Sequence, residues 1–154
     1  MTHLSKFVVT LFYSGFSKYM PGTLSSLISL PIVYFLFINL NQFIFLLLFV
    51  LIAIVSFYFI KIYIKDKINK DPKEITIDEF LGIYLIFIFL YNHDLKNIIN
   101  LGIIFIIFRI FDILKPYPIK IIDSKLKNAL GVILDDIFAS IYTIITFKLI
   151  HAIL

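Results

Sequence analysis

Three charged residues stand out in an otherwise apolar stretch, residues 108–118. Arg109, Asp112 and Lys115 follow the spacing i, i+3, i+6, which places all three on roughly one face of a helix. Pro116 is expected to end that helix. Charges inside apolar helices are costly and often functional, and this face could hold both a phosphate and a metal ion. An ion-pair ladder that only caps a membrane helix fits the same residues.

Further carboxylates occur in pairs or singly near the ends of other apolar segments. With no Cys in the chain and only scattered His, Cys-nucleophile chemistry is excluded and a histidine mechanism finds no support. Clustered carboxylates are the ligands that Mg²⁺ prefers, together with substrate phosphates. The predicted metal ligands are Asp78, Glu79, Asp112, Asp123, Asp135 and Asp136, and all of these except Asp123 are predicted to be catalytic.

Arg109 and Lys115 are the expected phosphate ligands, the first as a planar fork and the second as a point charge. Metal-assisted phosphoryl chemistry on a lipid head group is the resulting hypothesis. Asp78 and Glu79 have an alternative interpretation, because acids in the first turn of a helix also interact favourably with the helix dipole.

The composition indicates an integral membrane protein. Hydrophobic residues make up 61% of the 154-residue chain and the mean hydropathy is +1.02, well above the values of soluble domains. The length corresponds to one domain, residues 1–154. The predicted fold is an all-α, polytopic membrane bundle with a short N-terminal interfacial helix (residues 4–17) and about five spans. The expected spans are residues 24–40, 43–60, 80–91, 98–114 and a final helix from near 135 to 154.

The cations fall mainly in connections that alternating spans would bring to one side of the membrane. Segments 1–23, 61–78 and 109–134 hold twelve of the fourteen Lys and Arg residues. The positive-inside rule therefore predicts that these polar connections face the cytoplasm. Nine of the ten acids lie on the same side, so the charge asymmetry and the candidate site agree on one membrane face.

Three blocks of the sequence resemble the phosphatidylglycerophosphatase A family. The first is Met20 to Leu27 with the preceding Ser14-Gly15, and the second is Ile75 to Gly82. The third has the pattern F-R-x-x-D-x-x-K-P-x-P-I from Phe108, followed by a later D-D at Asp135. Their order and spacing extend along nearly the whole chain.

The resemblance implies Mg²⁺-dependent removal of the terminal phosphate from phosphatidylglycerophosphate, giving phosphatidylglycerol, at the cytoplasmic face of a bacterial inner membrane. It also implies a helical bundle around a central helix, and it places Thr23 with Arg109 and Lys115 at the phosphate. The expected partners are the lipid substrate and the membrane, and no nucleic acid. Two departures concern glycines of the family pattern, which are replaced by Ser25 and by Asn128-Ala129.

Two alternatives stay open at the level of sequence. One is a phosphatase or phosphotransferase that acts on another lipid phosphate, because no residue pattern specifies the acyl or glycerol contacts. The other is a non-enzymatic small transporter or ion-binding protein, which is disfavoured because the charges cluster on one side and not at mid-membrane.

Overall fold

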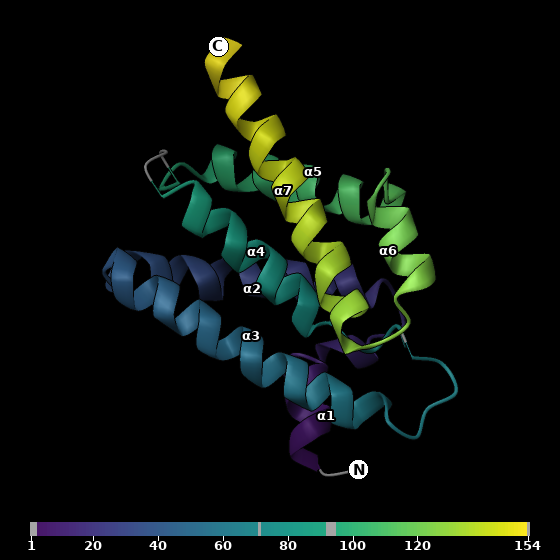
Figure 1. Ribbon diagram of the computed structural model, residues 1–154. Coiled ribbons are helices and arrows are strands. Elements are labelled where there is room, and N and C mark those ends of the chain that lie inside the picture. Colours follow the sequence, from purple (N-terminus) through teal and green to yellow (C-terminus); the bar gives the residue numbers. More distant parts are fainter. Residues whose placement is uncertain (1–2, 71, 92–94, 154) are drawn as a thin grey trace.

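The computed structural model describes residues 3–70, 72–91 and 95–153, and within these ranges it contains helices and no strand (Figure 1). The all-α prediction is therefore confirmed for the described chain. The elements in order are α1 (His3–Val9), the 3₁₀ turn η1 (Ser14–Phe16), α2 (Pro21–Asn39), α3 (Gln42–Ile64), α4 (Ile77–Phe89), α5 (Ile98–Leu114), α6 (Ile119–Lys125) and α7 (Ala129–Ile153).

Local sequence explains where α2 and α3 begin. Pro21 occupies the first turn of α2, where its missing N–H removes no helical hydrogen bond. Asn41 caps α3, since its Oδ1 accepts a hydrogen bond from the Ile44 N–H at 2.9 Å. Along α3, apolar side chains such as Phe43 and Ile54 are exposed, at 74% and 62%. An exposed apolar helix of 23 residues is suited to lipid contact.

Helix α4 lies at the centre of the bundle and packs against α2, α3 and α7. Ile83, Tyr84 and Phe87 are fully buried, and the Tyr84 hydroxyl donates to the Phe45 carbonyl of α3 at 3.0 Å. The helix has only 13 residues, so at 1.5 Å per residue it is about 20 Å long. Its apolar composition thus serves contacts within the protein.

The number of membrane spans differs from the expected five. Three helices, α2, α3 and α7, are long and apolar enough to cross a membrane. Helices α4 and α5 have 13 and 17 residues and fall short of that length. The three candidate spans indicate a membrane protein, while the prediction of about five spans with an interfacial helix is not confirmed.

Several predicted boundaries were wrong. The expected helix over residues 4–17 is interrupted after Val9, because Leu11, Phe12 and Tyr13 adopt positive φ. The last helix begins at Ala129, not near Asp135, and the predicted end of that helix, residue 154, lies outside the described residues.

The side chain of Asn128 accounts for the early start of α7. Its Oδ1 accepts hydrogen bonds from the Leu130 and Gly131 N–H groups, both at 3.0 Å, and so caps the helix. A short helix, α6, also occupies part of the stretch that was expected to be a polar connection. Asn128 therefore contributes a capping side chain where the family pattern usually has glycine.

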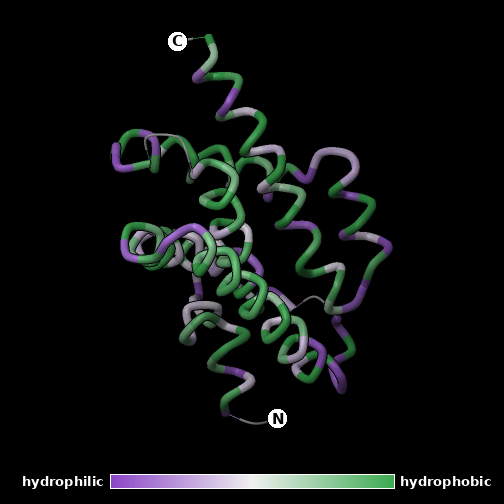
Figure 2. The backbone as a smooth tube through the Cα atoms, turned by 60° about the vertical axis from the view of Figure 1, so that its left-hand side comes forward, coloured by the Kyte–Doolittle hydropathy of each residue, from purple (hydrophilic) through white to green (hydrophobic). Residues whose placement is uncertain are grey.

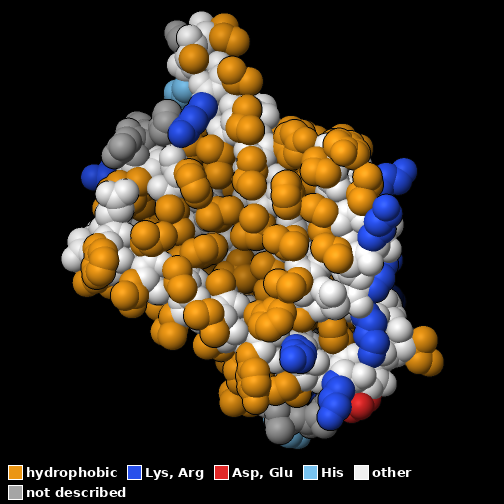
Figure 3. All heavy atoms as spheres, in the orientation of Figure 1, with side chains coloured by type: hydrophobic (Ala, Val, Ile, Leu, Met, Phe, Trp, Pro, Cys, Tyr) orange, Lys and Arg blue, Asp and Glu red, His pale blue; other side chains and the backbone are white. Residues whose placement is uncertain are grey.

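The starts of α2, α4 and α7 and the ends of α3 and α5 lie toward the same side of the bundle (Figure 1). Hydrophobic residues dominate the helices, and hydrophilic residues mark α6 and the connection between α3 and α4 (Figure 2). In Figure 3, hydrophobic side chains cover the middle of the face, and Lys and Arg side chains line its right-hand edge, the side of α6. On this face, most Lys and Arg side chains thus lie to one side of the apolar surface, as expected at a membrane boundary.

Gly82 allows α5 and α7 to approach α4. A Cβ at this position would lie 2.9 Å from the Phe108 ring and from the Ser140 Oγ. We expect Gly82→Val to destabilise the bundle by about 1–3 kcal/mol through overpacking, measured as a lower unfolding temperature in detergent. Gly102→Val is the matched control, because a Cβ at Gly102 meets nothing within 4 Å. Equal unfolding temperatures for the two variants would contradict this account.

Candidate active site

A pocket of about 650 Å³ opens where the polar helix ends meet. It is formed by the first turns of α2 and α4, the end of α5, and residues of α6 and α7. All the residues predicted for the site line this one pocket: Thr23, Asp78, Glu79, Arg109, Asp112, Lys115, Asp123, Asp135 and Asp136. The structure therefore brings together residues that lie up to 113 positions apart in the chain.

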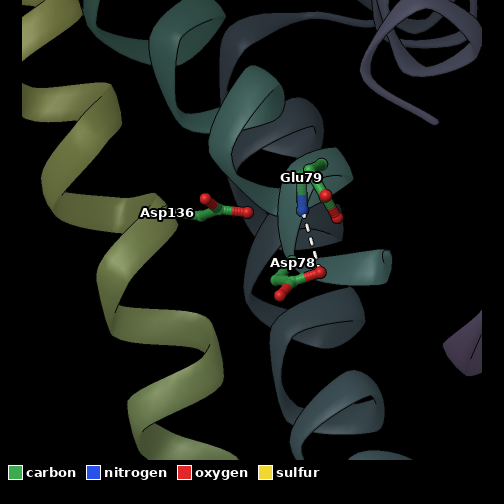
Figure 4. Close-up of side chains that lie close together, drawn as sticks. All are labelled: Asp78, Glu79 and Asp136. Atoms are coloured by element: carbon green, nitrogen blue, oxygen red, sulfur yellow. Dashed lines mark hydrogen bonds between the residues drawn. The ribbon is translucent and has the colours of Figure 1, made fainter. Parts of the chain in front are cut away.

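Three of the predicted acids form a compact buried cluster. Asp78 and Glu79 come from the first turn of α4, and Asp136 projects toward them from α7 (Figure 4). One carboxylate oxygen from each lies within 4.8 Å of the others, and all three residues are buried. The Glu79 N–H donates to Asp78 Oδ1 at 3.2 Å. Like charges this close repel, so the cluster is a strong candidate for cation binding.

Three buried polar atoms around the pocket lack a hydrogen-bond partner among the described residues. They are Glu79 Oε2, Thr23 Oγ1 and Arg109 Nε. A buried polar atom without a partner costs about 1–3 kcal/mol, so such atoms are rarely kept without a role. One acceptor that belongs to the acid cluster and two donors nearby match a site for a cation together with an oxyanion.

Arg109 is held in place by α2 and by its own helix. Its Nη1 contacts Asp112 Oδ2 at 2.8 Å and donates to Ser26 Oγ at 3.2 Å. Gly22 permits this approach, because a Cβ there would contact Glu79 Oε1 and lie 3.3 Å from both guanidinium Nη atoms. Gly22 and Ser26 were not assigned to the site from sequence, although both fall in the block that begins at Met20.

Lys115 does not continue the helical face that its spacing predicted. Helix α5 ends at Leu114 as expected before Pro116, and Lys115 adopts a left-handed conformation with φ of 43°. Its Nζ lies 2.6 Å from Asp135 Oδ2 and 3.0 Å from Asp123 Oδ1. The residue still lines the pocket, but through the bend after the helix.

The surroundings keep Lys115 positively charged. Burial acts to lower the pKa of its amine, but the charge of Asp135 and the hydrogen bonds with Asp135 and Asp123 outweigh burial and raise that pKa. The predicted acids thus divide into two groups. Asp112, Asp123 and Asp135 contact a cationic side chain, whereas Asp78, Glu79 and Asp136 form the cluster.

These features define a class: a helical membrane protein with a buried carboxylate cluster next to an arginine and a lysine. The model of the phosphatidylglycerophosphatase A family matches residues 7–151. The chain belongs to this family, and the resemblance seen in the sequence is confirmed. The predicted enzyme class, a phosphoric monoester hydrolase, is confirmed with it, in place of a non-enzymatic transporter.

Three curated relatives show the same relationship. Phosphatidylglycerophosphatase A of Haemophilus influenzae is 34% identical over 87% of this chain and 80% of its own length. The Escherichia coli (strain K12) protein of that name is 32% identical over 84% and 73%. A putative phosphatidylinositol-3-phosphatase of Bacteroides thetaiotaomicron is 31% identical over 88% and 86%. No solved structure matches the chain.

The contribution of the contact between Lys115 and Asp135 can be tested by measuring the stability of the fold. We expect Lys115→Met to lower the free energy of unfolding by about 1–3 kcal/mol, because it leaves the buried Asp135 carboxylate without this partner. Adding Asp135→Asn should recover part of the loss, with a coupling of about 0.5–3 kcal/mol measured by denaturation of the four proteins in detergent.

Lys127→Met serves as the control for that cycle. Lys127 is half exposed, and its Nζ lies 3.8 Å from Asp123 Oδ1, so its removal should cost no more than about 1 kcal/mol. Strictly additive effects of the Lys115 and Asp135 substitutions would show that the contact does not stabilise the fold.

Proposed function

We propose that this protein hydrolyses the phosphomonoester of phosphatidylglycerophosphate to phosphatidylglycerol and phosphate, as a step of phospholipid synthesis. The observation that carries the proposal is the pocket itself. In it, a buried carboxylate cluster adjoins two donors, Thr23 Oγ1 and Arg109 Nε, that have no hydrogen-bond partner in the described part of the chain. Acceptors for a cation and donors for an oxyanion in one pocket suit a phosphomonoester better than a neutral substrate. The names of two relatives support the choice of lipid.

The donor set of the cluster fits Mg²⁺. Asp78, Glu79 and Asp136 offer hard carboxylate oxygens at close range, and Glu79 Oε2 has no hydrogen-bond partner among the described residues. We propose that these residues hold the ion and that Asp112, Asp123 and Asp135 assist from the same pocket. Bound Mg²⁺ would neutralise phosphate charge and favour attack on phosphorus.

The chain's own cations would bind and orient the phosphate. Arg109 can donate from Nε while Asp112 and Ser26 hold its Nη1, so its plane is fixed before the substrate arrives. Thr23 can donate from its hydroxyl, and Lys115 adds a fixed positive charge. In the reaction, water oxygen forms the new bond to phosphorus, the bond from phosphorus to the glycerol oxygen breaks, and that oxygen takes up a proton.

The proposed location is the cytoplasmic face of a bacterial inner membrane. Exposed apolar side chains on α2, α3 and α7 would contact lipid, and the Lys-rich connection between α3 and α4 would meet anionic head groups. The pocket lies at the charged end of the bundle, so a lipid could keep its tails in the bilayer while its head group enters.

A second candidate substrate is another lipid phosphate. The Bacteroides relative carries the name of a phosphatidylinositol-3-phosphatase at a similar identity, which favours this alternative specifically. Phosphate release from phosphatidylglycerophosphate and from phosphatidylinositol 3-phosphate, compared in the same micelles, distinguishes the two. A higher kcat/KM for the inositol lipid would overturn the choice of phosphatidylglycerophosphate.

Removal of the metal or of one cluster acid should abolish activity. We expect Mg²⁺-dependent phosphate release by the wild type, none with a chelator, and a loss of at least about 100-fold in Asp136→Asn. Mg²⁺ at 100 times its Kd should also stabilise the wild-type fold by about 2.7 kcal/mol, and this increment should disappear in the variant.

The exposed acid Asp66 provides the control for charge removal, since it lies outside the pocket. Asp66→Asn should keep both the activity and the thermal shift with Mg²⁺.

Without the metal, Asp136→Asn should unfold at the same or a higher temperature than wild type, because the substitution removes repulsion between the cluster carboxylates. Full activity of Asp136→Asn, or activity in excess chelator, would refute the metal site.

Arg109→Lys tests the guanidinium fork separately from its charge. Lysine keeps a positive charge but lacks Nε and the planar geometry. We expect kcat/KM to fall by about 10²–10³-fold, in the range typical of losing one aligned donor. Circular dichroism checks that the fold is retained. Near-wild-type kinetics would mean that charge alone suffices at this position.

A further inference from the structure

A second hollow, of about 630 Å³, lies between α2 and α5. Its lining comes from residues 27–34 of α2 and 96–105 at the start of α5. The lining is apolar except for Lys96, which precedes α5 at the end remote from Arg109, and the Tyr34 hydroxyl. Its size falls within the ~300–1,000 Å³ typical of ligand pockets. The proposed reaction assigns no role to this groove.

Along both α2 and α5, the groove lies one helical turn from the candidate active site. Thr23 of the site stands one turn before Leu27 of the groove on α2, and Phe105 of the groove stands one turn before Arg109 on α5. Arg109 Nη1 donates to Ser26 Oγ at 3.2 Å, so the two helices are joined at the boundary between the hollows. The same pair of antiparallel helices therefore frames both.

The groove is open toward the surroundings of the bundle. Leu27 and Ile98, at its two ends, are 56% and 77% exposed. Gly102 widens its middle, because a Cβ at that position would meet nothing within 4 Å. One of its walls, α2, is long and apolar enough to cross a membrane. The opening thus lies along a candidate span, where lipid chains are the surrounding solvent.

We propose that this groove seats one acyl chain of the lipid whose phosphate enters the active-site pocket, a proposal that rests on the proposed function. A lipid held by its head group must direct its chains from the pocket into the bilayer. The α2–α5 groove begins one helical turn from Thr23 and Arg109 and carries apolar side chains over about two further turns.

This groove would contribute to lipid binding by packing against the acyl chain, and not by transferring the chain from water to an apolar site. Bilayer tails are as apolar as the groove, so a chain gains little by moving between them. A seated chain would instead fix the orientation of the glycerol and its phosphate relative to Arg109. The expected consequence is a preference for long-chain substrates over short-chain ones in catalytic efficiency.

Gly102→Phe places a ring in the groove at a position where a Cβ meets nothing within 4 Å, and Gly102→Ala is the matched control. Phosphate release is measured in detergent micelles with dipalmitoyl and with dibutyryl phosphatidylglycerophosphate. We expect the Phe variant to lose about 3–10-fold in kcat/KM on the long-chain lipid and less than about 2-fold on the short-chain lipid. The Ala variant should resemble wild type on both.

A binding measurement decides the proposal even if the enzyme assay fails. Phosphatidic acid with a diazirine on one acyl chain is photo-crosslinked to the protein in micelles, and the labelled peptides are mapped. We expect label within residues 27–34 and 96–105, reduced in Gly102→Phe but not in Gly102→Ala.

The outcomes separate the two proposals. Hydrolysis of no lipid phosphate by wild type would overturn the proposed function, while the mapping would still report on the groove. Label confined to other helices, label unchanged by Gly102→Phe, or chain-length-independent loss of activity would overturn the acyl groove. A chemical crosslink that joins residues 98–105 of one copy to a second copy of the chain would likewise overturn the acyl groove, since the second copy would then cover it.

Discussion

Mutual repulsion of three carboxylates is the constraint on which the rest of the structure depends. Asp78, Glu79 and Asp136 place oxygens within 4.8 Å of one another in an apolar body. Two unit charges at 4 Å repel by about 4 kcal/mol at an effective dielectric constant of 20. The positive end of α4 offsets part of this, because Asp78 and Glu79 lie in its first turn. Asp136 lies beyond the first turn of α7 and gains little from that helix's dipole.

Helix α4 holds this arrangement because it is anchored on several sides. Its buried side chains pack against α2, α3 and α7, so the position of its first turn is fixed by tertiary contacts. Two glycines allow the neighbours to come close: Gly82 faces Phe108 and Ser140, and Gly22 faces Glu79. A helix too short to span a bilayer thus fixes the site from the centre of the bundle. The central helix implied by the family resemblance corresponds to α4.

Sequence patterns predicted the all-helical class of fold and nine residues that the structure places in one pocket, because alternating apolar segments bring alternate connections together. They did not distinguish a membrane span from a buried helix: α4 is apolar because protein surrounds it, and hydropathy is the same in either case. The start of α7 was missed because Asp135 resembled a helix start, whereas the capping bonds come from Asn128. Lys115 was placed on a helical face, but its position depends on a left-handed turn that spacing does not reveal. Glu79 Oε2 lacks a hydrogen-bond partner within the described ranges because of tertiary packing, which has no sequence signal.

The ion pairs in the pocket hold its cationic side chains in fixed positions. Arg109 and Lys115 contact Asp112, Asp123 and Asp135, and these contacts fix their positions before any substrate binds. Groups that are already oriented need no reorganisation when a phosphate arrives, so their full electrostatic effect is available to the reaction. The carboxylate cluster adjoins these pairs, and its Glu79 Oε2 is an acceptor without a hydrogen-bond partner among the described residues. In the proposed reaction, the cluster acids would hold the cation, while the cationic side chains positioned by Asp112, Asp123 and Asp135 would bind the phosphate in the same pocket.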